Sequence, residues 1–137
     1  MYSYKHKVKY YETDKMGITH HSNYIRFMEE ARTEFLCYYG FDYAKLEEMG
    51  IISPVVSVES KYKATTTFPD EIEIFVTVDE IKGAKIRFNY TMKKADGTIC
   101  VEASSEHCFL TKDGKIVRLK KDFPDFYEAM TNLAENQ

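Results

Sequence analysis

The chain has little glycine and proline, with 6 and 3 of its 137 residues. It contains no repeat or low-complexity tract, so the sequence offers no linker at which two domains could be divided. It also lacks an apolar run of the roughly 20 residues that cross a bilayer. The positively charged start, MYSYKHKVKYY, has no apolar core behind it, unlike a secretory signal. We therefore expect one cytoplasmic domain over residues 1–137, with no membrane partner.

Cysteine is also scarce, and no C-x-x-C pair occurs. Cys37, Cys100 and Cys108 are an odd, widely spaced set. Such spacing is typical of buried thiols in a reducing compartment and does not suggest a disulfide framework. We expect Cys37, near the end of a helix, to belong to the core.

The chain lacks a basic excess, because Lys+Arg 19 stand against Asp+Glu 22 and give a net charge of -3. A general nucleic-acid binder needs such an excess to neutralise phosphates, so we expect no nucleic-acid partner. There is no G-x-S-x-G elbow and no glycine-rich phosphate loop. Glu12, Asp14, His20 and His21 could be imagined as metal ligands, but no i, i+4 histidine pair occurs. We expect no metal and no cofactor.

One helical stripe dominates the first third of the chain. Its apolar members recur at helical spacing: Tyr24, Phe27, Met28, Ala31, Phe35 and Tyr38. Ser22 is a candidate N-cap and Gly40 a candidate C-cap. Ile25 and Leu36 lie off the stripe, which predicts a helix covered on more than one side. Residues 42–49 predict a second, shorter helix that ends at Gly50.

Strand patterns occupy most of the remaining chain. Residues 4–11 alternate loosely, and a strict period of two follows at 56–62, 72–78, 86–92 and 101–109. Each of these later segments has one apolar and one polar face, as in an antiparallel sheet. Asp96-Gly97 and Asp113-Gly114 predict tight turns, and residues 122–133 predict a terminal helix. The pattern predicts an α+β fold in which a twisted, curved sheet wraps around the long helix.

The segment from Tyr11 to Tyr24 is the candidate functional site. It joins the first strand to the long helix, whose first N–H groups can bind an oxyanion. Asp14, a few residues upstream, could act on a carbonyl polarised there. Asp14 could equally form a turn, and His20 and His21 could be exposed loop residues. A Cys–His nucleophile pair also stays open, because spacing alone does not decide between these alternatives.

Two adjoining motifs decide between the alternatives. They are Asp14-x-x-Gly17-x-x-x-His21-x-Asn23-Tyr24 and the run Arg26-Phe27-Met28-Glu29-Glu30-Ala31-Arg32. In these motifs the chain resembles the hotdog-fold acyl-CoA thioesterases of the 4-hydroxybenzoyl-CoA thioesterase family. The resemblance implies a curved antiparallel β-sheet wrapped around a long central α-helix.

The resemblance also implies roles for individual residues. Asp14 matches the catalytic carboxylate, acting as nucleophile or as general base on water. His21 matches the helix-start residue whose N–H polarises the thioester carbonyl, and its side chain could also assist. Gly17, Asn23 and Tyr24 match positions that shape the site. Coenzyme A is part of the substrate, and the basic residues expected to meet it are Lys61, Lys63, Lys82, Lys85 and Arg87.

Partners and competing activities follow from the same resemblance. Family members associate as dimers or tetramers by joining sheets edge to edge, with sites at the subunit interface. We expect hydrolysis of an acyl-CoA to free acid and CoA. The alternatives are a thioesterase for acyl groups on an acyl-carrier protein, an enoyl-thioester hydratase, whose longer motif is absent, and a non-catalytic acyl-CoA-binding hotdog module.

Overall fold

The computed structural model describes residues 1–136, so Gln137, the last residue of the expected domain, lies outside the described residues. Most strands follow one another directly along the chain, without a helix between them. In chain order the elements are β1 (Ser3–Lys7), the 3-10 helix η1 (Tyr10–Glu12), α1 (Ser22–Tyr38), α2 (Tyr43–Glu48), β2 (Ile51–Ile52), β3 (Val55–Tyr62), β4 (Glu71–Lys82), β5 (Lys85–Lys94), β6 (Ile99–Cys108), β7 (Leu110–Thr111), α3 (Leu119–Asp122) and α4 (Pro124–Glu135).

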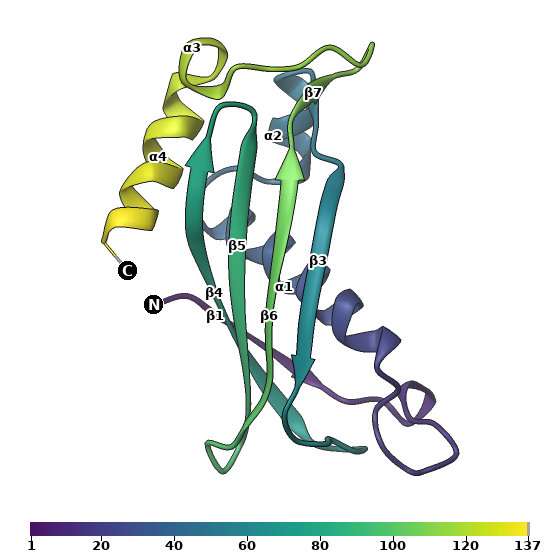
Figure 1. The fold of residues 1–137 in the computed structure, drawn as a ribbon. Coiled ribbons are helices and arrows are strands. Elements are labelled where there is room, and N and C mark those ends of the chain that lie inside the picture. The colour runs from purple at the N-terminus through teal and green to yellow at the C-terminus, as the bar shows by residue number, and fades with distance from the viewer. Residues whose placement is uncertain (137) are drawn as a thin grey trace.

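Five strands form one antiparallel sheet in the order β1-β4-β5-β6-β3, and β2 pairs with β7 separately. Figure 1 shows α1 crossing one face of this sheet, with α4 beside β4 on the side away from β3. The sheet bends toward α1 because strands twist. This arrangement confirms the predicted α+β class, with a curved antiparallel sheet and a long central helix.

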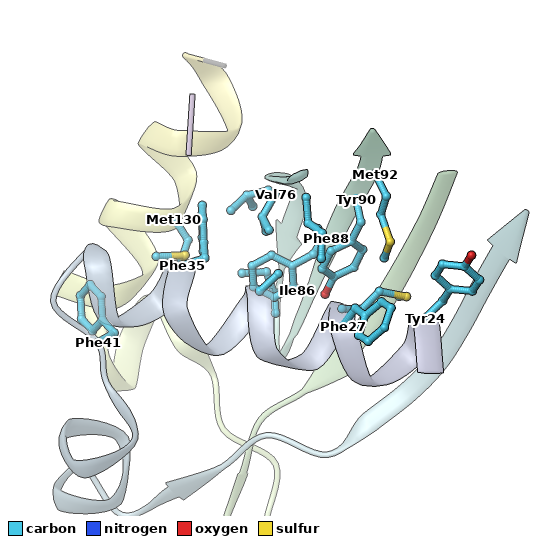
Figure 2. Close-up of a cluster of buried hydrophobic side chains, with 14 of the residues drawn as sticks. Tyr24, Phe27, Phe35, Phe41, Val76, Ile86, Phe88, Tyr90, Met92 and Met130 are labelled. Carbon is cyan, nitrogen blue, oxygen red and sulfur yellow. The ribbon is translucent and has the colours of Figure 1, made fainter. Parts of the chain in front are cut away.

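The core lies between α1 and the inner face of β4, β5 and β6. On β4 and β5 every second side chain is buried, as the period of two predicts. Figure 2 shows Phe27 and Phe35 of α1 directed toward Phe88 and Tyr90 of β5. Burying each such side chain contributes about 1.5–3 kcal/mol. The one-sided burial of the sheet therefore fixes which face receives α1.

Helix α1 ends in a Schellman motif. Phe41 N–H donates to Leu36 O at 2.8 Å, and Gly40 N–H donates to Cys37 O at 3.0 Å. Gly40 has a φ of 90°, which favours glycine. It was the expected C-cap but stands one position after the C-cap, which is Tyr39. α2 confirms the second predicted helix, and Asp42 caps it by accepting the Lys45 N–H at 2.8 Å.

Several predictions about α1 are wrong. Ser22 is the first helical residue, and the N-cap is His21, which makes no side-chain cap bond. Tyr38 and Cys37 are exposed, although the Tyr38 ring centroid lies 5.4 Å from that of Tyr2. Ile25 is exposed as well, but Leu36 is half-buried against the core, so a second side of α1 is covered at Leu36 and not at Ile25.

Two strand predictions need correction. The first strand stops at Lys7, because the Glu12 side chain accepts the Lys9 N–H and the chain turns into η1. On β3 the alternation is present, but seven of its eight residues are exposed. The register places Val58 and Tyr62 on the inner face, opposite Ser105 and Val101. They are exposed because α1 packs on β1 and β4.

The C-terminal part of the chain agrees with the predicted terminal helix. α4 buries Phe126 and Met130 and packs against β4, and Pro124 occupies its first position. The Asp96-Gly97 turn joins β5 to β6, as the pattern predicted. Among residues 1–136, no helix is long and apolar enough to span a membrane.

Candidate active site

Asp14 heads a tight loop between η1 and α1. Gly17 N–H donates to Asp14 O at 2.9 Å, and Asp14 N–H donates to Ile18 O at 2.8 Å. The Asp14 side chain accepts the Met16 N–H through Oδ1 at 2.8 Å. Gly17 supplies the positive φ of 82° that closes the turn. The predicted turn-forming role of Asp14 is therefore correct, and the same bonds fix where its carboxylate stands.

Glu12 anchors the beginning of this loop. Its carboxylate is buried, accepts the Lys9 N–H at 2.7 Å and lies 2.9 Å from His6 Nε2. Its carbonyl oxygen accepts from His20 N–H and from Asn23 Nδ2, both at 2.9 Å. Strand β1, the loop and the start of α1 are thus joined through one residue.

The start of α1 carries no side-chain cap. His21 has helical backbone angles, with a φ of -57° and a ψ of -27°. Within residues 1–136, no acceptor lies within hydrogen-bond distance of the His21 N–H. An unpartnered N–H at a helix start carries partial positive charge and can bind an oxyanion. The His21 N–H is therefore a donor available to a ligand.

Asp14 and His21 both line one pocket of about 250 Å³. Asp14, His21, Tyr24 and Lys63 are among its lining residues, together with Met16, Ile18, Thr19, Tyr62, Ala64 and Thr65. The structure thus brings together four of the residues that the sequence singled out, from the loop, α1 and the segment after β3. A carboxylate beside a helix start is an arrangement suited to attack on a polarised carbonyl.

A buried hydroxyl chain holds the pocket wall. Tyr24 Oη lies 2.8 Å from Thr66 Oγ1, which lies 2.6 Å from Thr19 Oγ1. Burial raises the pKa of Tyr24, so this phenol stays protonated at neutral pH. Sequence reasoning missed Thr19 and Thr66, because a contact across 47 residues leaves no local pattern.

Gly17 and Asn23 support the pocket from outside it. The Gly17 carbonyl accepts from Thr67 Oγ1 at 2.6 Å, and Asn23 is buried with its amide on Glu12 O. Neither residue lines the pocket. Their contacts are those of positioning residues.

The five basic candidates do not gather in one place. Lys63 lines the pocket and lies 3.6 Å from Glu102. Lys61 stands opposite Glu102 on the outer face of the sheet. Lys82, Lys85 and Arg87 line a separate hollow at the turn between β4 and β5, at the opposite end of the sheet (Figure 1).

Metal ligands were a further alternative in the sequence. Within residues 1–136, no three His, Cys, Asp or Glu side chains are grouped so that they could hold a metal ion. Glu12, named as one such ligand, instead bonds His6 and the Lys9 amide.

Comparison with known proteins identifies a family and several relatives of this chain. Residues 8–130 match the model of the thioesterase-like superfamily. The chain is 38% identical over 119 residues to a protein of Aquifex aeolicus provisionally named an esterase, covering 87% of this chain and 91% of that protein. It is 31% identical over 94 residues to the acyl-CoA thioesterase YbgC of Haemophilus influenzae, covering 68% and 69% of the two chains.

Solved structures agree with the sequence comparison. A DHNA-CoA thioesterase from Staphylococcus aureus superposes with a TM-score of 0.91 at 30% identity, covering 97% of this chain and 90% of that one. The similarity therefore extends over nearly the whole fold.

Proposed function

Because the chain belongs to the thioesterase-like superfamily, we propose that Asp14 and the His21 N–H are the groups with which it hydrolyses an acyl-CoA. The chain is a thioester hydrolase, and the acyl-CoA thioesterases among its relatives support CoA as the thiol. One observation carries the residue assignment. Asp14 and His21, whose N–H makes no hydrogen bond within residues 1–136, line the same pocket.

The His21 N–H polarises the thioester carbonyl in this proposal. The carbonyl oxygen accepts the N–H, and the negative charge that develops during attack lies at the positive end of α1. Removing one such donor typically costs about 100- to 1000-fold in kcat. The stacked ring of His20, 4.3 Å from the His21 ring, limits the side-chain positions that His21 can take.

Asp14 drives the attack by one of two routes. As general base it takes a proton from water, the hydroxide oxygen bonds the acyl carbon, and the carbon–sulfur bond breaks to give CoA thiolate, which takes up the proton. As nucleophile its oxygen bonds the acyl carbon directly and displaces the thiolate. Water then hydrolyses the mixed anhydride and returns the free carboxylate. The bond from Met16 N–H leaves the second carboxylate oxygen for either role.

A second copy of the chain is the proposed partner at β3. Val55, Val56 and Val58 are 53%, 47% and 39% exposed on this outermost strand. At the other side of the sheet, β1 and α4 together flank β4. An exposed apolar edge strand can pair with the edge strand of another chain. When two copies are related by a twofold axis, the paired strands are antiparallel. We expect a dimer joined through β3, with a tetramer as a further step.

Such a dimer gives the distant basic residues a role. An antiparallel β3 pair turns the β4–β5 end of one subunit toward the Asp14 end of its partner. Lys82, Lys85 and Arg87 then meet the CoA phosphates from the partner side, and Lys61 and Lys63 from the same side. In the single chain, Lys85 and Arg87 lie within 4.0 Å of Glu106. Phosphate oxygens would compete with that carboxylate for both cations.

Thiol release from short, medium, long and aromatic acyl-CoAs tests the proposal. We expect Asp14→Asn to lower kcat by about 100- to 10,000-fold, because the amide can neither take a proton nor attack. Asp96→Asn is the matched control, since Asp96 also accepts an N–H two residues on, from Thr98 at 2.9 Å, in an exposed turn. Full activity of Asp14→Asn would overturn the residue assignment.

The same panel separates the remaining alternatives. A wild type that hydrolyses acyl groups only from an acyl-carrier protein would move the substrate away from CoA. Binding of acyl-CoA without any thiol release would indicate a non-catalytic module.

A further inference from the structure

A second, larger cavity lies away from Asp14. It has a volume of about 460 Å³ between α1, α2 and β2, and its apolar walls include Leu36, Phe41, Leu46 and Ile51. Arg32 contributes a charged group to the lining. Glu29, Glu47 and Lys112 are the other charged lining residues. A cavity of this volume that combines apolar walls with polar groups is within the range of small-molecule sites.

Arg32 is held in place by neutral groups. Its Nη1 lies 3.4 Å from His107 Nε2, His107 Nε2 lies 2.7 Å from Ser105 Oγ, and Ser105 Oγ lies 2.7 Å from Tyr90 Oη. His107, Ser105 and Tyr90 are all buried. In the described part of the chain, no carboxylate lies within ion-pair distance of Arg32. The guanidinium therefore has a fixed position at a residue that lines the cavity, and it has no direct carboxylate partner.

The chain path places this cavity and Asp14 at opposite ends of β3. Ile52 and Ser53, just before the first residue of β3, line the Arg32 cavity. Tyr62, the last residue of β3, lines the Asp14 pocket. Eight residues of strand span roughly 25 Å, so the two cavities of one chain are far apart. In the antiparallel β3 dimer, the first residues of one β3 lie beside the last residues of the other.

We propose that the Arg32 cavity holds the acyl group of a substrate bound at the partner's Asp14. Arg32 then selects acyl groups whose far end carries an oxygen acceptor, which is a carboxylate, carbonyl or hydroxyl. Guanidinium supplies up to five donors in a fixed plane, and an alkyl end would leave the inward donors unpaired. Glu29 and Glu47 also line the cavity, so a neutral oxygen fits its mixed charge as well as a carboxylate does. This inference rests on the proposed thioesterase function and on the β3 dimer.

Three acyl-CoAs of equal chain length test the selection by Arg32. They are hexanoyl-CoA, 6-hydroxyhexanoyl-CoA and adipoyl-CoA, which end in a methyl, a hydroxyl and a carboxylate. We expect wild type to favour the two oxygenated substrates in kcat/KM. Arg32→Met should lower kcat/KM for those two by about tenfold to a hundredfold, the usual effect of losing a charged hydrogen bond. Turnover of hexanoyl-CoA should change far less. An equal loss on all three, or no preference in wild type, would overturn the role of Arg32.

Mixed dimers test whether the cavity serves the partner, and they do not depend on Arg32 variants folding. Ile52→Trp fills the cavity mouth from β2, and Ile116→Trp is an exposed control outside the cavity. Each defective homodimer, Asp14→Asn or Ile52→Trp, should be nearly inactive on adipoyl-CoA. After co-refolding in equal amounts, half of the dimers are mixed, and each mixed dimer has one site with both parts intact. About a quarter of wild-type turnover should therefore return.

The outcomes separate the two proposals. If each site instead uses Asp14 and the cavity of the same subunit, every site of a mixed dimer carries one defect and no turnover returns. That result would overturn the cavity assignment alone. A wild type that releases no thiol from any acyl-CoA would overturn the proposed function itself. Mixing Asp14→Asn with Ile116→Trp is the control for the mixing of subunits during refolding, because only the Asp14→Asn subunit is defective in that mixture.

Discussion

At the scale of single residues, Glu12 controls the geometry of the Asp14 loop. Its side chain is buried and bonded at both His6 and the Lys9 amide, and its carbonyl receives two further donors from His20 and Asn23. Buried polar groups of this kind cost free energy when one partner is removed, because the other partners stay buried without a bond. A residue outside the pocket can therefore set both stability and activity.

Glu12→Ala should lower the free energy of unfolding by ~2 kcal/mol, since it leaves Nε2 of His6, whose side chain is only 10% exposed, without its partner. Urea unfolding measures this change. Glu30→Ala is the matched control, because Glu30 lies 3.6 Å from the other ring nitrogen of His6 but is 45% exposed at its side chain. We expect Glu30→Ala to change stability by less than ~1 kcal/mol. Equal effects of the two variants would contradict the anchoring role of Glu12.

Some residues of the two cavities could be predicted from local sequence patterns, and others could not. The turn at Asp14 was predictable because it is local, with the carboxylate bonded to an N–H two residues on. The roles of Gly17 and His21 came from the family resemblance, because spacing alone left them open. The contact between Arg32 and His107 was not predictable, because 75 residues separate them and only the sheet brings them together. Ser22 was expected to cap α1, but its hydroxyl bonds His20 Nδ1 at 2.8 Å and the helix starts one residue earlier.

At the scale of elements, β3 is the strand that a single chain leaves incomplete. Its pairing with β6 places Val58 on the inner face beside Ser105, as the alternation predicted. Periodicity shows which side chains share a face, but it does not show what covers that face. The burial expected for Val56, Val58 and Tyr62 therefore failed, while the same pattern succeeded on β4 and β5, which α1 and β6 flank.

Val58→Lys should dissociate the proposed dimer. In a twofold β3 pair the middle of the strand lies near the axis, so each new lysine meets its own copy, and the valine surface is lost. Light scattering should give twice 16.1 kDa or a larger multiple for wild type and 16.1 kDa for the variant. Ile116→Lys, an exposed site away from β3, is the control and should keep the wild-type mass. A wild type of 16.1 kDa would exclude the β3 dimer.

At the scale of the whole molecule, a polar chain runs through an otherwise apolar core. His107 is fully buried between Ser105 and Arg32, and within residues 1–136 its Nδ1 has no hydrogen-bond partner. From the alternation of β6, the sequence predicted that His107 lies on the inner face of the sheet. It also predicted the sheet and the helix around this residue. It did not predict that a charge on Arg32 would lie beside the imidazole, since that depends on how α1 crosses the sheet.

His107 makes the stability of the whole molecule depend on pH. Burial, and then the charge of Arg32, lower the pKa of His107 from 6.5 to about 4. Because the folded pKa lies below that of the unfolded chain, the unfolded state binds a proton first as the pH falls. The stabilisation is therefore complete above pH 6.5 and is lost progressively between pH 6.5 and about 4, by ~3 kcal/mol in total.

Urea unfolding at several pH values between 7.5 and 4, on wild type and His107→Gln, measures this window. The neutral amide has no proton to gain, so the stability difference between the two proteins should shift by ~3 kcal/mol in favour of the variant as the pH falls through the window. Carboxylates titrate in both proteins and cancel in the difference. A constant difference between wild type and His107→Gln would mean that the core tolerates a charged His107. We do not expect that outcome, because a protonated His107 would place a second positive charge beside the Arg32 guanidinium.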